Sequence, residues 1–488
     1  MQGKKTNINI LVVLRMIGWL LMIEAFFMLF PIIAGVVFGE REAVWAFVWS
    51  AAITAGAGAL MTFGIRPVNT EMRKREGILL TAVVWVFFSL FGMLPFLFDG
   101  ALETVTDAFY EAMAGFTTTG STMISDLEAV SHPVLLWRAI MQWLGGMGII
   151  LFTLAVIPML NHSGGIQLFN AEVTGITHDK LRPRISSTAK SLWMVYMALS
   201  VVLCLLLWIG PMGWFDAICH TLTTVSTGGF STKNESIGWW NSTYVEGIVA
   251  LFMFLGGVNI ALVFRAATGN FRALTGNSTF RWYLGIILAF SVLFALSMLG
   301  HDEFGGWLDV VFTVLSGVTS TGFATIDFEN CGDFVILLMM MLIFFGGCAG
   351  STAGGAKIDR IELLMKNSRN EFYRVLHPNS IIPLRVNSKV VPVPVVMKVI
   401  AFLGMYLMLM VVGAIAMTWM DMPVFDAFFS ALSMISNSGL GVGCTGAGGS
   451  YLALPDGVKW LQTALMLIGR LELFTVMVLL TRGFWAKS

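Results

Sequence analysis

Four related segments decide the fold of this chain: DAFYEAMAGFTTTGST (107–122), DAICHTLTTVSTGGFST (216–232), DVVFTVLSGVTSTGFAT (309–325) and DAFFSALSMISNSGLGV (426–442). Each begins with Asp and carries a glycine thirteen residues later, at Gly120, Gly229, Gly322 and Gly439. Their apolar stretches of about 10–14 residues suit re-entrant helices better than membrane spans. Small and hydroxyl-bearing residues are common where membrane helices pack, so one such cluster would mean little. Four clusters with the same offset predict an internal repeat.

The composition places these repeats in a membrane. The chain has 488 residues, of which 57% are hydrophobic and 12% are charged, with Lys+Arg and Asp+Glu both at 29. Soluble domains have about 25% charged residues, so the composition excludes a disordered protein, a nucleic-acid binder that relies on bulk positive charge and an ordinary soluble enzyme. The five cysteines form no C-x-x-C pair and the six histidines no H-E-x-x-H, so no disulfide framework or zinc site is predicted.

The hydrophobic pattern predicts an all-α polytopic membrane protein with ten transmembrane helices, because a span needs about 20 apolar residues. The predicted spans are 10–38, 43–64, 77–98, 134–157, 190–210, 243–266, 282–299, 333–356, 394–419 and 458–482. Each re-entrant segment falls between two spans, which gives four helix–pore loop–helix repeats in a pseudo-fourfold pore, preceded by two extra helices. The predicted divisions are 1–76 (two N-terminal helices), 77–189, 190–280, 281–390 and 391–488 (pore repeats 1 to 4).

The repeated segments have the chemistry of a cation filter. Asp at the start of each short helix is expected to cap its free N–H groups, so the negative carbonyl end would point toward the membrane centre. Glycine lets successive carbonyls turn toward one axis, and rings of carbonyls replace the hydration shell of K⁺ in potassium filters. The predicted K⁺ filter residues are Thr118, Thr119, Gly120, Ser121, Thr227, Gly228, Gly229, Phe230, Ser320, Thr321, Gly322, Phe323, Asn437, Ser438, Gly439 and Leu440.

The pattern resembles the Trk/Ktr/HKT superfamily of potassium transporters, and the two extra helices and the length resemble its TrkH branch. The resemblance implies one filter glycine per repeat, K⁺ as the transported ion and no organic cofactor in this chain. Gly120 occupies a position where serine accompanies sodium transport in plant relatives, which favours K⁺. The fourth repeat departs from Thr-x-Gly because it reads Asn437-Ser438-Gly439. That departure predicts a chemically asymmetric ring with weaker selectivity than a symmetric potassium channel.

A glycine-rich run interrupts the predicted span 333–356 and is the first candidate for a gate. It comprises Gly346, Gly347, Cys348, Ala349, Gly350, Ser351, Thr352, Ala353, Gly354 and Gly355. Such a run should not hold a stable helix, and we expect a mobile loop below the filter. The resemblance implies an intramembrane loop that obstructs the pore. A close-packing surface for a neighbouring helix is the alternative, and a phosphate-binding loop is rejected because Ile358 follows Lys357 and the spacing is wrong.

Arg470 is the second gate candidate. It lies midway along the predicted span 458–482, where a charged residue is costly and usually faces a cavity or a partner. It matches the family's pore-facing arginine, and we expect it to hydrogen-bond loop carbonyls when the pathway is closed. The alternative is a structural ion pair with Glu472 or Glu24.

A basic connection from Lys357 to Lys398 suggests either a positive-inside signal or a docking surface for a cytosolic regulator. The resemblance implies a separate TrkA-type nucleotide-binding subunit and a homodimer of the membrane subunit. The Lys/Arg bias predicts that both termini lie in the cytoplasm, and the resemblance implies a multi-pass protein of the bacterial inner membrane. A Na⁺-permeable or Na⁺-coupled relative and a secondary transporter of an organic solute are the competing functions. The spans hold no catalytic Asp pair, Ser/His arrangement or metal motif, so we expect no enzyme.

Overall fold

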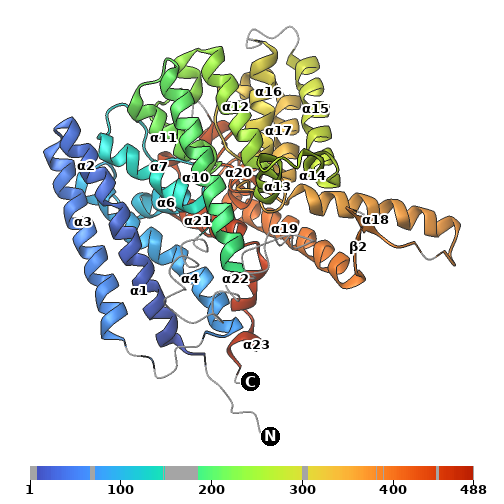
Figure 1. Ribbon diagram of the computed structural model, residues 1–488, viewed down its shortest axis with the longest axis horizontal. Helices are drawn as coiled ribbons and strands as arrows, with labels where there is room; N and C mark the ends of the chain where they lie inside the picture. The colour runs from blue at the N-terminus through green and yellow to red at the C-terminus, as the bar shows by residue number, and fades with distance from the viewer. Residues whose placement is uncertain are drawn as a thin grey trace, which may run out of the picture.

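The protein is built almost entirely of helices, as Figure 1 shows. The computed structural model describes residues 8–65, 67, 72–146, 148, 185–298, 306–380, 382–387, 389–446 and 450–486. The helices of its N-terminal part are α1 (Ile10–Phe27), α2 (Leu29–Phe38), α3 (Arg41–Ala59), η1 (Leu60–Gly64), α4 (Lys74–Gly92), α5 (Leu94–Asp99), α6 (Val105–Phe116) and α7 (His132–Gly146). Of the predicted span 134–157, residues 147 and 149–157 lie outside the described residues.

Long and short helices also alternate in the rest of the chain. Its elements are α10 (Ile185–Ile209), α11 (Trp214–Val225), η3 (Ser236–Trp240), α12 (Thr243–Gly257), α13 (Ile260–Ala267), α14 (Phe271–Thr275), α15 (Ser278–Met298), α16 (Trp307–Val318), η4 (Phe328–Cys331), α17 (Asp333–Phe345), α18 (Ile358–Leu376), β1 (Arg385–Val386), β2 (Lys389–Val390), α19 (Val393–Trp419), α20 (Val424–Ile435), η5 (Gly443–Thr445), η6 (Tyr451–Ala453), α21 (Asp456–Arg470), α22 (Phe474–Leu479) and α23 (Arg482–Trp485). The two strands form one antiparallel ladder.

Six described helical segments are long and apolar enough to cross a membrane. They are Ile10–Phe38, Arg41–Gly64, Arg75–Asp99, Ser191–Ile209, Ser278–Met298 and Val393–Trp419. The pair α12 and α13 would add a seventh, but it is bent by 111°. The multi-pass membrane fold is therefore confirmed, while ten spans and the limits of the four repeats stay predictions.

The N-terminal helices pack beside the remainder of the molecule. Figure 1 shows α1, α2 and α3, in blue, along one side. Helices α1 and α3 approach closely because small residues face each other: a Cβ added at Gly18 would lie 2.7 Å from the carbonyl oxygen of Gly58. This arrangement keeps the two extra N-terminal segments outside the group of short buried helices.

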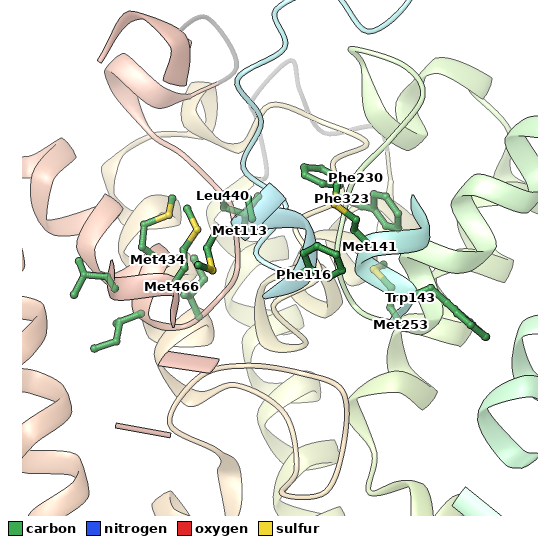
Figure 2. Packing of buried hydrophobic residues seen from close by; sticks show 14 of the residues in the cluster. Met113, Phe116, Met141, Trp143, Phe230, Met253, Phe323, Met434, Leu440 and Met466 are labelled. Carbon is green, nitrogen blue, oxygen red and sulfur yellow. The ribbon is translucent and has the colours of Figure 1, made fainter. Parts of the chain in front are cut away.

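Short helices are present at all four predicted places, as α6, α11, α16 and α20, each 12 residues long, and their re-entrant course in the membrane stays a prediction. Each starts two residues before its Asp, so the expectation that Asp is the capping residue is wrong. Asp107 lies in the first turn of α6, and the N-cap is Thr104, whose side chain accepts from the Asp107 N–H. The acidic group still lies at the positive end of the helix dipole. Figure 2 shows Met113 of α6, Met141 of α7 and Met434 of α20 in the buried apolar cluster around these helices.

The predicted last span, 458–482, is not one helix. Helix α21 ends at Arg470 and α22 begins at Phe474, with left-handed backbone at Glu472 (φ 54°) and Leu473 (φ 50°) between them. Such conformations are strained for residues other than glycine and end the helix. Arg470 therefore lies at the C-terminal end of a helix instead of midway along one.

Candidate functional site

The loops that follow the four short helices share one backbone conformation. In each loop, the residue two positions before the glycine that lies thirteen residues after Asp has a left-handed φ. These residues are Thr118 (54°), Thr227 (52°), Ser320 (51°) and Asn437 (53°). The glycines also have positive φ, at Gly120 (85°), Gly229 (82°), Gly322 (84°) and Gly439 (69°). Left-handed backbone at three hydroxyl residues and one amide is uncommon, and such strain clusters at functional sites.

These four glycines form a closed cycle of close approaches. A Cβ added at each glycine would meet the carbonyl oxygen of the residue that precedes the next glycine. The distance from the added Cβ to the carbonyl oxygen would be 2.1 Å for Gly120 and Gly228 and 1.9 Å for Gly229 and Thr321. It would be 2.5 Å for Gly322 and Ser438 and 2.0 Å for Gly439 and Thr119. A side chain would therefore collide with backbone at every position. The sequence prediction that the four glycine segments come together is matched by this geometry.

Several buried side chains in and next to the cycle are hydrogen-bonded to one another. The Oγ1 atoms of Thr117 and Thr119 lie 2.8 Å apart, and those of Thr319 and Thr321 lie 2.6 Å apart. Asn437, the residue that departs from the repeat, donates from Nδ2 to Thr119 Oγ1 at 3.0 Å. These bonds restrain the threonine hydroxyl groups, and the one from Asn437 ties the fourth segment directly to the first.

The glycine-rich loop lies against the C-terminal ends of three short helices. Helix α17 ends at Phe345, as the run of glycines predicted. Thr352 Oγ1 donates to the carbonyl oxygen of Val225 at 3.3 Å, Gly354 N donates to Ser320 Oγ at 2.6 Å, and Gly355 N donates to the carbonyl oxygen of Ser436 at 3.0 Å. The loop therefore lies directly next to the strained residues of the cycle.

The same loop fills the bend between α12 and α13. Cys348 N donates to the carbonyl oxygen of Gly257 at 2.9 Å, and Asn259 Nδ2 donates to that of Ala349 at 2.6 Å. Asn259 is also the N-cap of α13, since its side chain accepts from Ala261 N. The sequence treated 243–266 as one span because a 111° bend leaves the hydropathy unchanged.

Arg470 binds carbonyl groups on two sides. Its Nη1 donates to the carbonyl oxygen of Thr352 in the loop at 3.3 Å, and its Nη2 donates to that of Gly145 in α7. Its guanidinium lies 5.8 Å from the ring centroid of Trp85. The expected bond to a loop carbonyl is present. Glu472, proposed as an alternative partner, instead pairs with Arg360. Arg470 also borders a cavity of ≈ 40 Å³ next to Gly354 and Asn437.

Sequence reasoning missed two polar residues of α7 that contact the second repeat. Arg138 is buried and pairs with Glu111 at 2.7 Å, and its Nη1 donates to the carbonyl oxygen of Ser231 at 3.0 Å. Gln142, one turn later, contacts Gly228 and Phe230. The signal was available, because polar residues inside an otherwise apolar span are expensive unless they have partners.

Comparison with known proteins places the chain in a family. A family model described as TrkH, cation transport protein, matches residues 43–299 and 284–484. The chain belongs to the TrkH family. It is 34% identical to the Trk system potassium uptake protein TrkH of Escherichia coli (strain K12), over 97% of this chain and 99% of that protein. The corresponding protein of Halomonas elongata is 36% identical, with 97% and 99% covered.

A solved structure of the TrkH family shares the fold. The crystal structure of the potassium transporter TrkH from Vibrio parahaemolyticus superposes with a TM-score of 0.87 at 31% identity, covering 98% of this chain and 100% of that one. The resemblance found in the repeated segments is confirmed. The chain is a transporter and not an enzyme, as the sequence indicated.

Proposed function

We propose that this chain is the potassium-translocating subunit of a Trk system, and that K⁺ passes through the cycle formed by the residues around Gly120, Gly229, Gly322 and Gly439. The closed cycle of glycine–carbonyl approaches carries this proposal, because it gathers backbone oxygens from four separate segments at one place. Backbone oxygens can replace the water ligands of a K⁺ ion. The names of the relatives as potassium uptake proteins support K⁺ as the substrate.

The filter proposal covers four residues from each segment, 118–121, 227–230, 320–323 and 437–440. The four short helices end just before these residues, so the negative ends of their dipoles favour a cation there. The proposed architecture is a pseudo-fourfold pore of four repeats within ten spans.

The glycine-rich loop 346–355 and Arg470 are the proposed gate. In the conformation described, the loop is bonded to the ends of α11, α16 and α20, and Arg470 holds its Thr352 carbonyl. A positive charge beside the loop also opposes the passage of a cation. Opening would have to move the loop and release these bonds together.

The proposed assembly is a homodimer in the bacterial inner membrane, with both termini cytoplasmic and a cytosolic TrkA-type regulatory subunit. The family's Trk system supports a partnership with other Trk components. The basic connection 357–398, which includes α18, is the proposed docking surface. Figure 1 shows α18, in orange, extending away from the rest of the molecule.

Flux measurements test the proposal. Purified protein in vesicles should carry ⁸⁶Rb⁺ down its gradient and restore growth to a strain that lacks potassium uptake. Gly322→Ser should abolish or degrade this flux, because a Cβ at position 322 would lie 2.5 Å from the Ser438 carbonyl oxygen. Movement of an organic solute without Rb⁺ flux would overturn the proposal.

A Na⁺-permeable transporter is the second candidate, and one observation favours it. Asn437 breaks the chemical symmetry of the cycle, because the first three segments have threonine or serine at the matching position. Its side-chain amide donates a hydrogen bond to Thr119. Competition of Na⁺ with ⁸⁶Rb⁺ in the same vesicles separates the two: strong competition supports this candidate, and weak competition supports a K⁺ pathway.

A further inference from the structure

One quarter of the cycle is built differently from the other three. The residue before the glycine is Thr119, Thr321 or Ser438 in three segments but Gly228 in the second. Gly228 has no left-handed φ, so its backbone conformation does not require glycine. Glycine is required here for lack of space, because a Cβ at position 228 would lie 2.4 Å from both Cδ and Oε1 of Gln142. The side chain of Gln142 occupies the volume that a threonine or serine occupies in the other segments.

Gln142 is also bonded to the backbone on both sides of Gly229. Its Nε2 donates to the carbonyl oxygen of Gly228 at 2.6 Å, and its Oε1 accepts from Phe230 N at 3.0 Å. The side chain is fully buried in α7. The Gly228 oxygen that it binds is the one that faces Gly120 in the cycle. One amide therefore fixes the orientation of a single peptide segment at the proposed ion path.

A second residue on the same face of α7 extends this support. Arg138, four positions before Gln142, donates to the Ser231 carbonyl oxygen and lies 4.0 Å from the ring centroid of Phe230. Among the described residues, no side-chain donor is recorded on the corresponding oxygens of Thr119, Thr321 or Ser438. Side chains also reach other segments, since Ser316 Oγ donates to the Phe323 carbonyl oxygen and Tyr451 Oη donates to that of Gly439. Neither bond involves the oxygen before the glycine, so a donor on that oxygen is specific to the second segment.

We propose that Gln142 is a positioning residue that sets ion selectivity, acting through the Gly228 carbonyl. This inference rests on the proposed filter. The amide N–H occupies one lone pair of that oxygen and restrains its direction. The Gly228 carbonyl is therefore fixed, while the carbonyl oxygens of Thr119, Thr321 and Ser438 can reorient toward a bound ion. A carbonyl fixed by a donor adjusts less to ions of different radius, and it therefore discriminates between K⁺ and Na⁺.

Two single substitutions and their combination test the inference. Gln142→Ala removes both hydrogen bonds and should lower the K⁺/Na⁺ flux ratio by about tenfold, the scale expected for loss of one to two buried hydrogen bonds. Gly228→Thr alone should stop flux, since the new side chain overlaps Gln142. The double substitution Gln142→Ala with Gly228→Thr should recover most of the flux, because the vacated volume accepts the threonine. Ser226 precedes Gly229 by three residues, as Thr319 precedes Gly322, so it can accompany the new threonine as Thr319 accompanies Thr321. Ser226 and Thr319 both donate to the carbonyl four residues before them.

Two further variants separate positioning from packing. Gln142→Met has a similar volume but can neither donate to the Gly228 carbonyl oxygen nor accept from Phe230 N, so it should lose selectivity while it keeps most of the packing. Gln462→Ala removes another fully buried amide, which donates to Ser430 Oγ at 2.8 Å and not to the carbonyl oxygens of the cycle, and it should leave the flux ratio unchanged.

The outcomes distinguish this inference from the function on which it rests. If Gln142→Ala and Gln142→Met keep the wild-type K⁺/Na⁺ flux ratio while Gly322→Ser loses flux, the filter stands and the inference is wrong. If the double substitution is as inactive as Gly228→Thr, the compensation between positions 142 and 228 is wrong. If Gly322→Ser behaves as wild type, the proposed filter itself fails.

Discussion

Arg360, in the first turn of α18, forms an ion pair with Glu472, at the break that ends α21, across 112 residues of sequence. The Arg360 guanidinium also lies 3.8 Å from the ring centroid of Phe402 in α19. Glu472 is two residues from Arg470, and Lys357 at the start of α18 donates to the Ala353 carbonyl of the glycine-rich loop. Helix α18 is therefore joined to both parts of the proposed gate.

Breaking this ion pair should raise the basal flux. Both side chains are largely buried, at 11% and 19% exposure, so removing one partner should cost about 2 kcal/mol, between the values for exposed and buried pairs. Arg360→Met or Glu472→Gln should then increase ⁸⁶Rb⁺ flux about tenfold or more in vesicles without a regulatory subunit. The charge exchange Arg360→Glu with Glu472→Arg should return the flux toward wild type, and equal flux in all variants would contradict the coupling.

Arg470→Ala should increase flux further, because it removes the donor to Thr352 and Gly145 together with a positive charge. Hydrogen bonds from charged groups contribute about 1.5–3 kcal/mol, so an increase of at least tenfold is expected. Arg470→Lys keeps the charge but cannot serve two carbonyls with the same planar geometry, and it should give an intermediate ⁸⁶Rb⁺ flux. Unchanged transport and gating in Arg470→Ala would remove Arg470 from the gate.

Gly229→Ala should reduce ⁸⁶Rb⁺ flux more than tenfold. The new Cβ would lie 1.9 Å from the Thr321 carbonyl oxygen, and the left-handed φ of 82° adds strain for any residue other than glycine. Gly247→Ala is the matched control, since it lies in α12 with open space where the Cβ would be. Similar flux in the two variants would contradict the role of Gly229.

Arg138→Met should destabilise the protein. Arg138 and Glu111 are 1% and 0% exposed, and loss of one partner from a buried pair costs about 3–5 kcal/mol. The expected result is a clear fall in the melting temperature in detergent. The double substitution Arg138→Met with Glu111→Gln should be more stable than Arg138→Met alone, because it leaves no unpaired buried carboxylate. A melting temperature equal to wild type in the single variant would argue against a structural role for this pair.

Neutralising exposed basic residues of the 357–398 connection should weaken binding of the proposed cytosolic subunit. Arg369 in α18 and Lys389 in β2 are both exposed, so Arg369→Gln with Lys389→Gln should leave the fold intact. Reduced recovery of a TrkA-type subunit in a pull-down, with normal insertion, supports docking. If the same amount of the TrkA-type subunit is recovered but the orientation of the protein in the membrane changes, the role of these charges is to set membrane topology instead.

Local sequence patterns predicted much of the fold and the position of the site. The spacing from Asp to glycine located α6, α11, α16 and α20, and the glycine run located the end of α17 at Phe345. Contacts between distant residues could not be read in this way. The pair of Arg360 with Glu472 joins residues far apart in sequence, and the support of Gly228 by Gln142 requires α7 to lie beside another segment. The break after Arg470 was missed because hydropathy continues across Leu471 and Leu473.

The four glycines of the cycle lie in one chain, and this has a consequence for how such a pathway can change. In a channel made of four identical subunits, one codon alters every quarter of the filter at once. Here a single codon alters one quarter, so Gly228 with Gln142, and Asn437 with Thr119, are local departures that the other quarters need not share. If the cycle is the filter, as proposed, ion preference can be adjusted in small steps, each of which leaves the carbonyl oxygens of three quarters in place.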